Sequence, residues 1–370
     1  MSNQERIPVA APLLGGNEKK YVMECIDTTW ISSSGRFIRA FEEMFAEFCG
    51  VRHAIATSNG TVALHLALVA LGVEPGDEII VPTLTYITTA NAVRCCNATP
   101  IFADCDPGTL NIDPLDIARQ ITPRTKGIIV VHLYGHPVDM DPILELARAY
   151  GLFVLEDAAE AHGAEYRGQR VGGFGECATF SFFGNKIVTS GEGGMVTTND
   201  DQLAQRLRLH RGQGMDPDRR YWHPVIGYNY RITNIAAAIG LAQMEKVDQA
   251  LEARYRLAGW YAERLAGLTD RLSLLKVEEW ARPVFWMQTV LLSEGGEADR
   301  HRVMARLDAA NIETRPVFYP MHVLPPYRQD SARFPNATSC AARGINLPTH
   351  ALLSEDDVDR VCQELAVALR

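Results

Sequence analysis

Long apolar runs are missing from the sequence. No stretch approaches the ~18 residues that a membrane-spanning helix requires, although 47% of the 370 residues are hydrophobic. The first residues, 1–6, lack the charged-then-apolar pattern of a secretory leader. Both absences lead us to expect a cytoplasmic protein that has no membrane partner. Basic residues are in deficit as well, because 45 acidic side chains against 36 basic ones give a formal net charge of −9. This balance disfavours nucleic acid as a partner.

Repeated Cys-x-x-Cys spacing is also absent. The eight cysteines are scattered, which disfavours both a zinc framework and a disulfide scaffold, and we expect reduced, mostly buried thiols. They are Cys25, Cys49, Cys95, Cys96, Cys105, Cys177, Cys340 and Cys362. Internal repeats and low-complexity tracts are lacking too. What remains is the composition of a globular enzyme large enough for about two or three domains.

Short apolar segments alternate with helical patterns over the first half of the chain. The expected strands are residues 54–56, 78–81, 100–103, 127–131 and 152–155, and the expected helices are residues 17–29, 37–49, 62–71, 86–93, 114–120 and 141–150. This alternation predicts an α/β fold in which helices cover both faces of a mostly parallel sheet. Ligands of such sheets bind at the carboxyl ends of the strands.

The second half continues with an expected strand at 178–183, helices at 202–209, 235–251, 301–310 and 354–369, and a strand at 284–292. No change in composition marks a linker. The pattern alone therefore places a large domain at residues 1–245 and a smaller C-terminal domain at residues 246–370. The helix at 235–251 is rich in small residues, which allow close approach, and we interpret it as a candidate subunit contact.

Asp157 is the carboxylate that most needs an explanation. It follows an apolar strand, where a charged group is poorly solvated unless a cation accompanies it. A metal is one explanation, because Glu156, Glu160 and His162 lie near it in sequence, but their spacing repeats no known ligand pattern. We favour no metal, and an aspartate that stabilises the protonated nitrogen of an aromatic cofactor ring.

A second feature is the small polar turn at residues 57–61, between an expected strand and a helix. That arrangement points free backbone N–H groups and the positive end of the helix dipole at an anion. A phosphate group would be accommodated at Gly60 and Thr61. Helix capping alone would explain the serine and asparagine of this turn equally well.

Lys186 lies in a third feature, a segment whose following residues, 189–194, are mostly small. Most lysines on loops are solvated surface charges. The alternative is a desolvated amine with a lowered pKa that forms a Schiff base with a carbonyl, and glycines favour it because they let the backbone approach a flat cofactor closely. Two further segments have open interpretations. Residues 30–36, which begin with Trp30, are either a loop or a nucleotide or sugar contact, and the Pro-rich residues 314–322 either close over a substrate or form a buried connection.

Five motifs together resemble the nucleotide-sugar aminotransferases of the DegT/DnrJ/EryC1/StrS family. In chain order they are SNGT at 58–61, EDAAEAHG at 156–163, SFFGNK at 181–186, GEGG at 191–194 and GYNYR at 227–231. The resemblance spans nearly the whole chain. It implies pyridoxal 5'-phosphate, the aspartate aminotransferase fold (fold type I) and a homodimer with shared active sites.

The resemblance also implies roles for individual residues. Lys186 matches the Schiff-base lysine, and Asp157 matches the carboxylate that faces the pyridine nitrogen. Gly60, Thr61 and Ser181 match phosphate contacts, Asn229 a phosphate contact from the neighbouring subunit, Tyr86 the aromatic that stacks on the ring, and Glu160 a polar residue near the ring hydroxyl. Lys186 would then move a proton as general base and acid, with pyridoxamine 5'-phosphate formed between two half-reactions.

The substrate implied by the resemblance is a nucleotide-linked keto sugar, with glutamate as amino donor. Some relatives carry histidine at the lysine position and deoxygenate the sugar, so Lys186 favours amino transfer. Residues 132–137, 315–322 and 325–327 resemble the members that aminate C4 of GDP-4-keto-6-deoxymannose, which would make Tyr319 and His322 sugar-side contacts. Two alternatives stay open: a 4- or 3-aminotransferase for a dTDP- or UDP-linked sugar, and a non-catalytic regulatory protein of the same fold.

Overall fold

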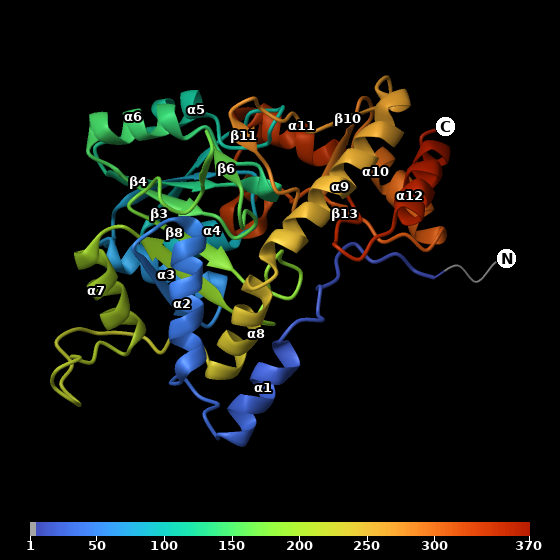
Figure 1. Cartoon of the computed structure of the whole chain (residues 1–370). Coiled ribbons are helices and arrows are strands. Elements are labelled where there is room, and N and C mark those ends of the chain that lie inside the picture. The colour runs from blue at the N-terminus through green and yellow to red at the C-terminus, as the bar shows by residue number, and fades with distance from the viewer. Residues whose placement is uncertain (1–4) are drawn as a thin grey trace.

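The computed structural model describes residues 5–370 (Figure 1). Residues 1–4, part of the segment in which we found no leader pattern, lie outside the described chain. Within residues 5–370, no helix is both long and apolar enough to cross a membrane.

A seven-stranded sheet forms the centre of the larger part of the molecule, with strand order β1-β9-β8-β5-β4-β2-β3. β9 pairs antiparallel with both of its neighbours, and every other pairing is parallel. The strands of this sheet are almost fully buried, because helices lie on both of its faces. They are β1 (His53–Thr57), β2 (Glu78–Pro82), β3 (Thr99–Ala103), β4 (Thr125–Val131), β5 (Phe153–Asp157), β8 (Cys177–Ser181) and β9 (Gly194–Thr198).

The helices around this sheet follow the predicted order, with small shifts at their ends. They are α1 (Glu18–Asp27), α2 (Arg36–Cys49), α3 (Gly60–Ala70), α4 (Thr88–Cys95), α5 (Pro114–Gln120), α6 (Met140–Tyr150), α7 (Asp201–Arg211) and α8 (Asn234–Met244). α2 shows why they dock: its phenylalanines recur at helical spacing and all lie on the buried face. The predicted mostly parallel α/β sheet is confirmed.

The predicted single helix at 235–251 is wrong, because the chain leaves helical geometry at Lys246 between α8 and α9 (Val247–Leu265). At this break the Lys246 ammonium pairs with the buried carboxylate of Glu18 at 2.6 Å. The small residues of α8 serve packing within the chain. A Cβ added to Gly240 would lie 2.7 Å from the Phe41 ring of α2. Figure 1 shows α1, α2 and α8 side by side at the bottom of the molecule.

The smaller C-terminal part has its own four-stranded antiparallel sheet, in the order β10-β12-β14-β13. Its strands are β10 (Leu272–Leu274), β12 (Gln288–Leu292), β13 (Arg315–Pro316) and β14 (Gly344–Leu347), and its helices after α9 are α10 (Glu297–Ala309), α11 (Pro335–Arg343) and α12 (Glu355–Ala368). α9 runs between the two parts in Figure 1. The smaller C-terminal α+β region is confirmed, whereas the boundary at 245/246 stays a prediction.

A short strand that follows α9 in the chain pairs with the larger part of the molecule and so connects the two parts a second time. β11 (Ala281–Arg282) pairs with β6 (Glu165–Tyr166), which pairs with β7 (Gln169–Arg170). The predicted strand 284–292 is correct only from Gln288 onwards. Residues 283–287 are irregular, because Phe285 has a left-handed φ of 48° and the Val284 amide bonds to the Gly135 carbonyl. Short 3-10 helices lie at Leu133–Gly135, Ala266–Leu268, Met321–Val323, Pro325–Tyr327 and Ser331–Arg333.

Candidate active site

A cavity of about 470 Å³ opens at the carboxyl ends of the central strands. This is the edge of the sheet where the alternating pattern predicts ligands. Of the residues singled out from the sequence, it brings together Gly60, Thr61, Tyr86, Asp157, Glu160, Ser181 and Lys186. The structure therefore gathers into one pocket seven residues that are spread over 127 positions, from 60 to 186.

One wall of the pocket is the N-terminus of α3. The Asn59 side chain caps this helix by accepting a hydrogen bond from the Val62 amide at 3.0 Å. The amides of Gly60 and Thr61 precede it and have no acceptor within residues 5–370. Ser181, the last residue of β8, lies so close that a Cβ on Gly60 would come within 2.8 Å of its Cβ. The result is a polar cradle suited to an anion.

Asp157 lies at the bottom of the pocket. It is the last residue of β5, so the strand ends two residues later than predicted, in two buried acids. The Thr89 hydroxyl donates to one oxygen of Asp157 at 2.8 Å, and the Ala159 amide approaches the other at 3.3 Å. Burial raises the pKa of Asp157, while the hydrogen bond from Thr89 opposes the shift. Within residues 5–370 no cationic side chain forms an ion pair with it, so a cationic ligand group would suit it.

Glu156 has different partners from its neighbour Asp157. It is fully buried and accepts hydrogen bonds from His132 Nε2 at 3.1 Å and from the amides of Gly172, Phe174 and Gly175. Burial alone would raise the pKa of Glu156, but these hydrogen bonds outweigh it and hold the pKa below its ordinary value. Glu156 therefore fixes the loop that follows β7. Among the described residues, no group of three or more acidic, histidine or cysteine side chains is placed to hold a metal.

Lys186 projects into the pocket from the loop between β8 and β9. Its Nζ lies 3.8 Å from Glu160 Oε1, and both side chains are nearly buried. Burial lowers the pKa of Lys186, although the charges of Glu160 and Asp157 oppose this shift. Burial likewise raises the pKa of Glu160 to about 7. Both shifts favour the uncharged forms of the two groups.

Trp286 is a pocket residue that our sequence reasoning missed. Its ring face lies 3.8 Å from Lys186 Nζ, measured to the ring centroid, and its Nε1 donates to the Asn185 carbonyl at 2.9 Å. The apolar run around it predicted a regular strand, and nothing in that run indicates the left-handed residue Phe285. Thr89 was missed as well, because its bond to Asp157 joins positions 68 residues apart.

The predicted contacts Asn229, Tyr319 and His322 do not line this pocket. Asn229 is exposed, and its side-chain oxygen accepts from Arg231 Nε at 3.1 Å. Tyr319 is half-exposed and donates to Glu297. His322 is fully buried, with one ring nitrogen against Thr83 and the other against Thr338. His322 thus packs in the interior, and the structure gives no support to its predicted sugar contact. Of residues 314–322, Arg315 and Phe318 line the pocket.

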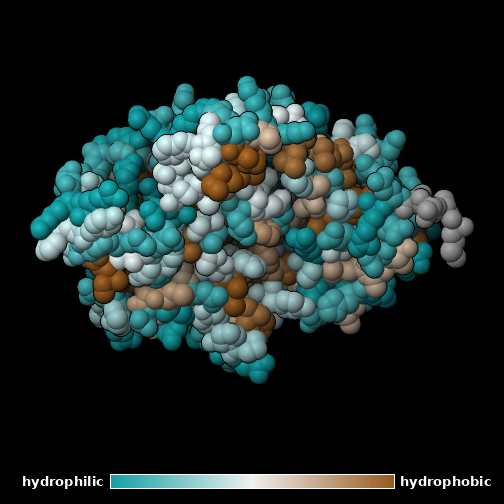
Figure 2. Space-filling model, turned by 90° about the horizontal axis from the view of Figure 1, so that it is seen from below, coloured by the Kyte–Doolittle hydropathy of each residue, from teal (hydrophilic) through white to brown (hydrophobic). Residues whose placement is uncertain are grey.

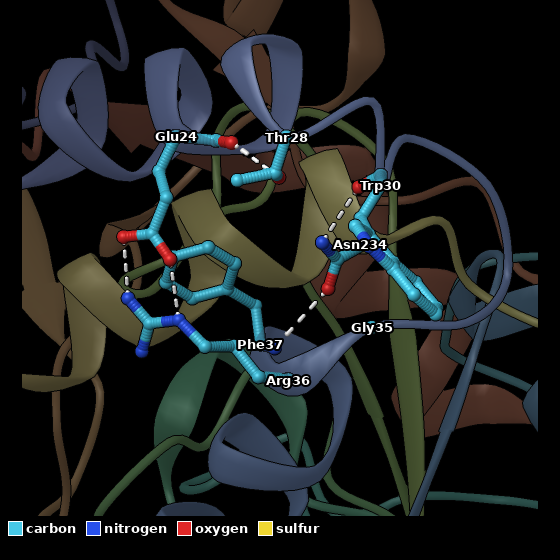
Figure 3. Close-up of a pocket in the computed structure, with 7 residues that line it drawn as sticks. All are labelled: Glu24, Thr28, Trp30, Gly35, Arg36, Phe37 and Asn234. Carbon is cyan, nitrogen blue, oxygen red and sulfur yellow. Dashed lines mark hydrogen bonds and ion pairs between the residues drawn. The ribbon is translucent and has the colours of Figure 1, made fainter.

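Trp30 borders a separate cavity of about 500 Å³ (Figure 3). The Asn234 amide group connects its walls, because Nδ2 donates to the Trp30 carbonyl at 2.7 Å and Oδ1 accepts from the Phe37 amide at 3.1 Å. Arg36 pairs with Glu24 on the opposite side, and the Trp30 ring extends away from that pair. The two cavities share no lining residue, so Trp30 lies outside the pocket of Lys186.

Comparison with known proteins assigns the class of this fold and pocket. The solved structure of S. venezuelae DesV in complex with a ketimine intermediate superposes with a TM-score of 0.93, at 35% identity over 99% of this chain and 100% of that one. The protein is an enzyme of the aminotransferase class that uses pyridoxal phosphate. It belongs to the DegT/DnrJ/EryC1/StrS aminotransferase family, whose sequence profile matches residues 12–366.

Two curated relatives match over almost their whole length. The GDP-perosamine synthase of Caulobacter vibrioides is 60% identical over 368 residues, which covers 99% of each chain. The GDP-perosamine synthase of Escherichia coli O157:H7 is 50% identical over 362 residues, or 97% of each chain. The family expected from the five motifs is therefore confirmed.

Proposed function

We propose that the protein transfers the amino group of glutamate to C4 of GDP-4-keto-6-deoxymannose and so makes GDP-perosamine. The observation that carries this proposal is the 60% identity, over 99% of both chains, to a relative named for that product. The product would be a deoxyamino sugar for O-antigen or antibiotic glycosylation, made in the cytoplasm.

The residues of the pocket suit pyridoxal phosphate. The amides of Gly60 and Thr61, which have no acceptor within residues 5–370, would hold the phosphate together with Ser181. Asp157 is a buried carboxylate that a cation such as a protonated ring nitrogen would suit. Tyr86, which is 58% exposed at the rim, would lie against the ring. When bound, the cofactor supplies an electron sink that allows a Cα proton of the amino donor to be removed.

The chain's own groups would then control that proton. The neutral amine of Lys186 would accept the Cα proton as general base. The resulting ammonium would then return the proton to carbon as general acid. Asp157 would supply the negative charge that a protonated ring nitrogen requires, and Thr89 fixes one of its oxygens by a hydrogen bond of 2.8 Å. Glu160, 3.8 Å from the amine, stabilises the lysine in its protonated form.

We also propose a homodimer in which the partner subunit's Asn229 completes the phosphate site. Asn229 is exposed outside the pocket of its own chain, as a residue that serves a second copy would be. Large apolar side chains of the preceding segment, residues 221–226, are also exposed, namely Tyr221, Trp222, Val225 and Ile226, and so are Trp30 and Ile31. Figure 2 shows several hydrophobic patches on the face seen from below, and burial against a second copy would remove such patches from water.

A coupled assay tests the proposed reaction. Purified protein would be incubated with pyridoxal phosphate, glutamate and a panel of GDP-, dTDP- and UDP-linked 4-keto-6-deoxy sugars, and the products would be identified by mass. We expect only the GDP-linked sugar to gain an amino group. Amination of a dTDP- or UDP-linked sugar alone would overturn the perosamine assignment in favour of the alternative substrates and leave the aminotransferase class intact.

An absorbance measurement tests the catalytic against the regulatory interpretation. Protein reconstituted with pyridoxal phosphate should show the long-wavelength band of a cofactor joined to a lysine, and Lys186→Ala should lack it. Glu192→Gln is the matched control, because Glu192 lines the same pocket and bears no proposed bond to the cofactor. If the reconstituted wild-type protein had no such band, the catalytic interpretation would fail.

A further inference from the structure

The amine of Lys186 contacts two groups of different kinds. They are the Glu160 carboxylate, 3.8 Å from Nζ, and the face of the Trp286 ring, whose centroid is 3.8 Å from the same atom. The negative face of an indole attracts an ammonium and does little for a neutral amine. These two contacts define a position for the charged amine of Lys186 that does not depend on a covalent bond to the cofactor.

Trp286 is held in place by three hydrogen bonds and a stacked ring. Its Nε1 donates to the Asn185 carbonyl, next to Lys186, and its backbone amide donates to the Tyr134 carbonyl at 3.0 Å. Its carbonyl accepts from the buried guanidinium of Arg254 at 3.1 Å. Its ring stacks on that of Tyr134 at 6.2 Å and 17°. Only 4% of the residue is exposed, so the ring is preorganised and does not follow the lysine.

A held position matters for the reaction proposed above. In that reaction Lys186, once free of the cofactor, would take a proton from one carbon and return it to another. A lysine side chain has four rotatable bonds, and a loosely held amine would therefore spend much of its time away from the reacting carbon.

We propose that Trp286 is a positioning residue for Lys186: its ring face, together with Glu160, sets the place that the released ammonium occupies between proton transfers. The proposal rests on the proposed role of Lys186 and extends it to a residue of the C-terminal part. Trp286 itself exchanges no proton.

The other titratable groups near the amine do not account for this arrangement. Asp157 acts on Lys186 as a more distant negative charge, and no ion pair joins the two. Burial lowers the pKa of His162 to about 3, so this histidine stays neutral at working pH. Tyr134, on which Trp286 stacks, has its pKa raised by burial and is likewise neutral. The ring face is therefore a contact that favours the charged lysine in addition to the carboxylates of Glu160 and Asp157.

The test compares variants of residue 286 in the holoenzyme after glutamate has released Lys186 from the cofactor. Acetic anhydride labelling across a pH series, followed by peptide mass spectrometry, measures the pH at which Lys186 becomes reactive, with the exposed Lys126 as internal standard. In Trp286→Leu, which keeps an apolar side chain and loses the ring face, the midpoint should fall by roughly 0.4 to 1.5 pH units. Trp286→Phe keeps a ring face and loses the bond to Asn185, and its midpoint should lie closer to that of the wild type.

Site-specific replacement of Trp286 by mono- and difluorotryptophan preserves the shape of the ring and weakens its negative face. The midpoint should fall stepwise with fluorine content, and kcat should fall with it while KM for glutamate stays unchanged. This series keeps the proposal open to refutation if the leucine variant fails to fold. A midpoint that does not move in the fluorinated proteins would overturn the proposal and leave the role of Lys186 standing. A cofactor band that persists in Lys186→Ala would instead refute the proposed function itself.

Discussion

The pair of Glu160 and Lys186 offers a sharp test of how the pocket controls protons. Glu160→Gln removes one negative charge 3.8 Å from Lys186 Nζ and preserves the shape of the side chain. At that distance, with an effective dielectric constant of about 20, the charge is worth roughly 4 kcal/mol to the ammonium, or about 3 pH units. Burial raises the pKa of Glu160 to about 7, so the carboxylate is only partly ionised near neutrality. We therefore expect a smaller shift, of about one to two units.

The sign of the shift follows from which form each group stabilises. The ionised Glu160 favours the protonated lysine and so raises its pKa, against the lowering caused by burial. Without that charge the amine becomes neutral at lower pH. In single-turnover reactions with glutamate, followed by the absorbance of the cofactor, the acidic limb of the rate profile should move to lower pH in Glu160→Gln.

A matched control separates this effect from a general loss of charge in the pocket. Glu192→Gln removes a carboxylate that lines the same cavity and has no ion pair with Lys186 within the described chain. Its acidic limb should coincide with that of the wild-type enzyme. Profiles of Glu160→Gln and the wild type that superimpose would refute the electrostatic coupling inferred from the structure.

Three other substitutions have expected outcomes. Asp157→Asn should lower kcat by about 10²- to 10³-fold, measured in the coupled assay, because the amide places no negative charge beneath the ring nitrogen. Gly60→Ala should weaken cofactor binding in absorbance titrations, since its Cβ would meet Ser181 at 2.8 Å; Gly184→Ala, with no atom within 4 Å, is the control and should bind normally. Gly240→Ala should destabilise the protein by about 1–3 kcal/mol in denaturant unfolding, because its Cβ would lie 2.7 Å from the ring of Phe41.

The order of strands and helices in the larger part was predictable because each element carries its own period. The strands are short apolar runs, and α2 repeats phenylalanine at helical spacing. Positions next to strand ends could be predicted for the same reason, and Ser181 and Asp157 both end parallel strands that are neighbours in the sheet. The prediction of a single helix at 235–251 failed. The break between α8 and α9 coincides with the ion pair between Lys246 and Glu18, which lies 228 positions away, so no local pattern indicates it.

The residues of the pocket also differ in whether the sequence alone could predict them. Gly60, Thr61 and Lys186 lie in segments whose small residues distinguish them from their surroundings, so the sequence alone could single them out. Thr89 and Trp286 lie in ordinary helical and apolar surroundings, and only the tertiary fold places them against Asp157 and Lys186. The residues to which we assign the chemistry were therefore visible in the sequence, whereas those that contact and orient them in the structure were not.

The position of Trp286 shows that the pocket depends on both parts of the chain. β11 pairs with β6 of the larger part, and the amides of Val284 and Trp286 then bond to the carbonyls of Gly135 and Tyr134. Arg254, on α9, donates to the carbonyls of Phe285 and Trp286 and so holds the same segment from the other side. A buried guanidinium is costly unless its hydrogen bonds are made. The segment that brings an aromatic face to Lys186 is therefore secured by α9, the helix that leads from the large sheet to the small one.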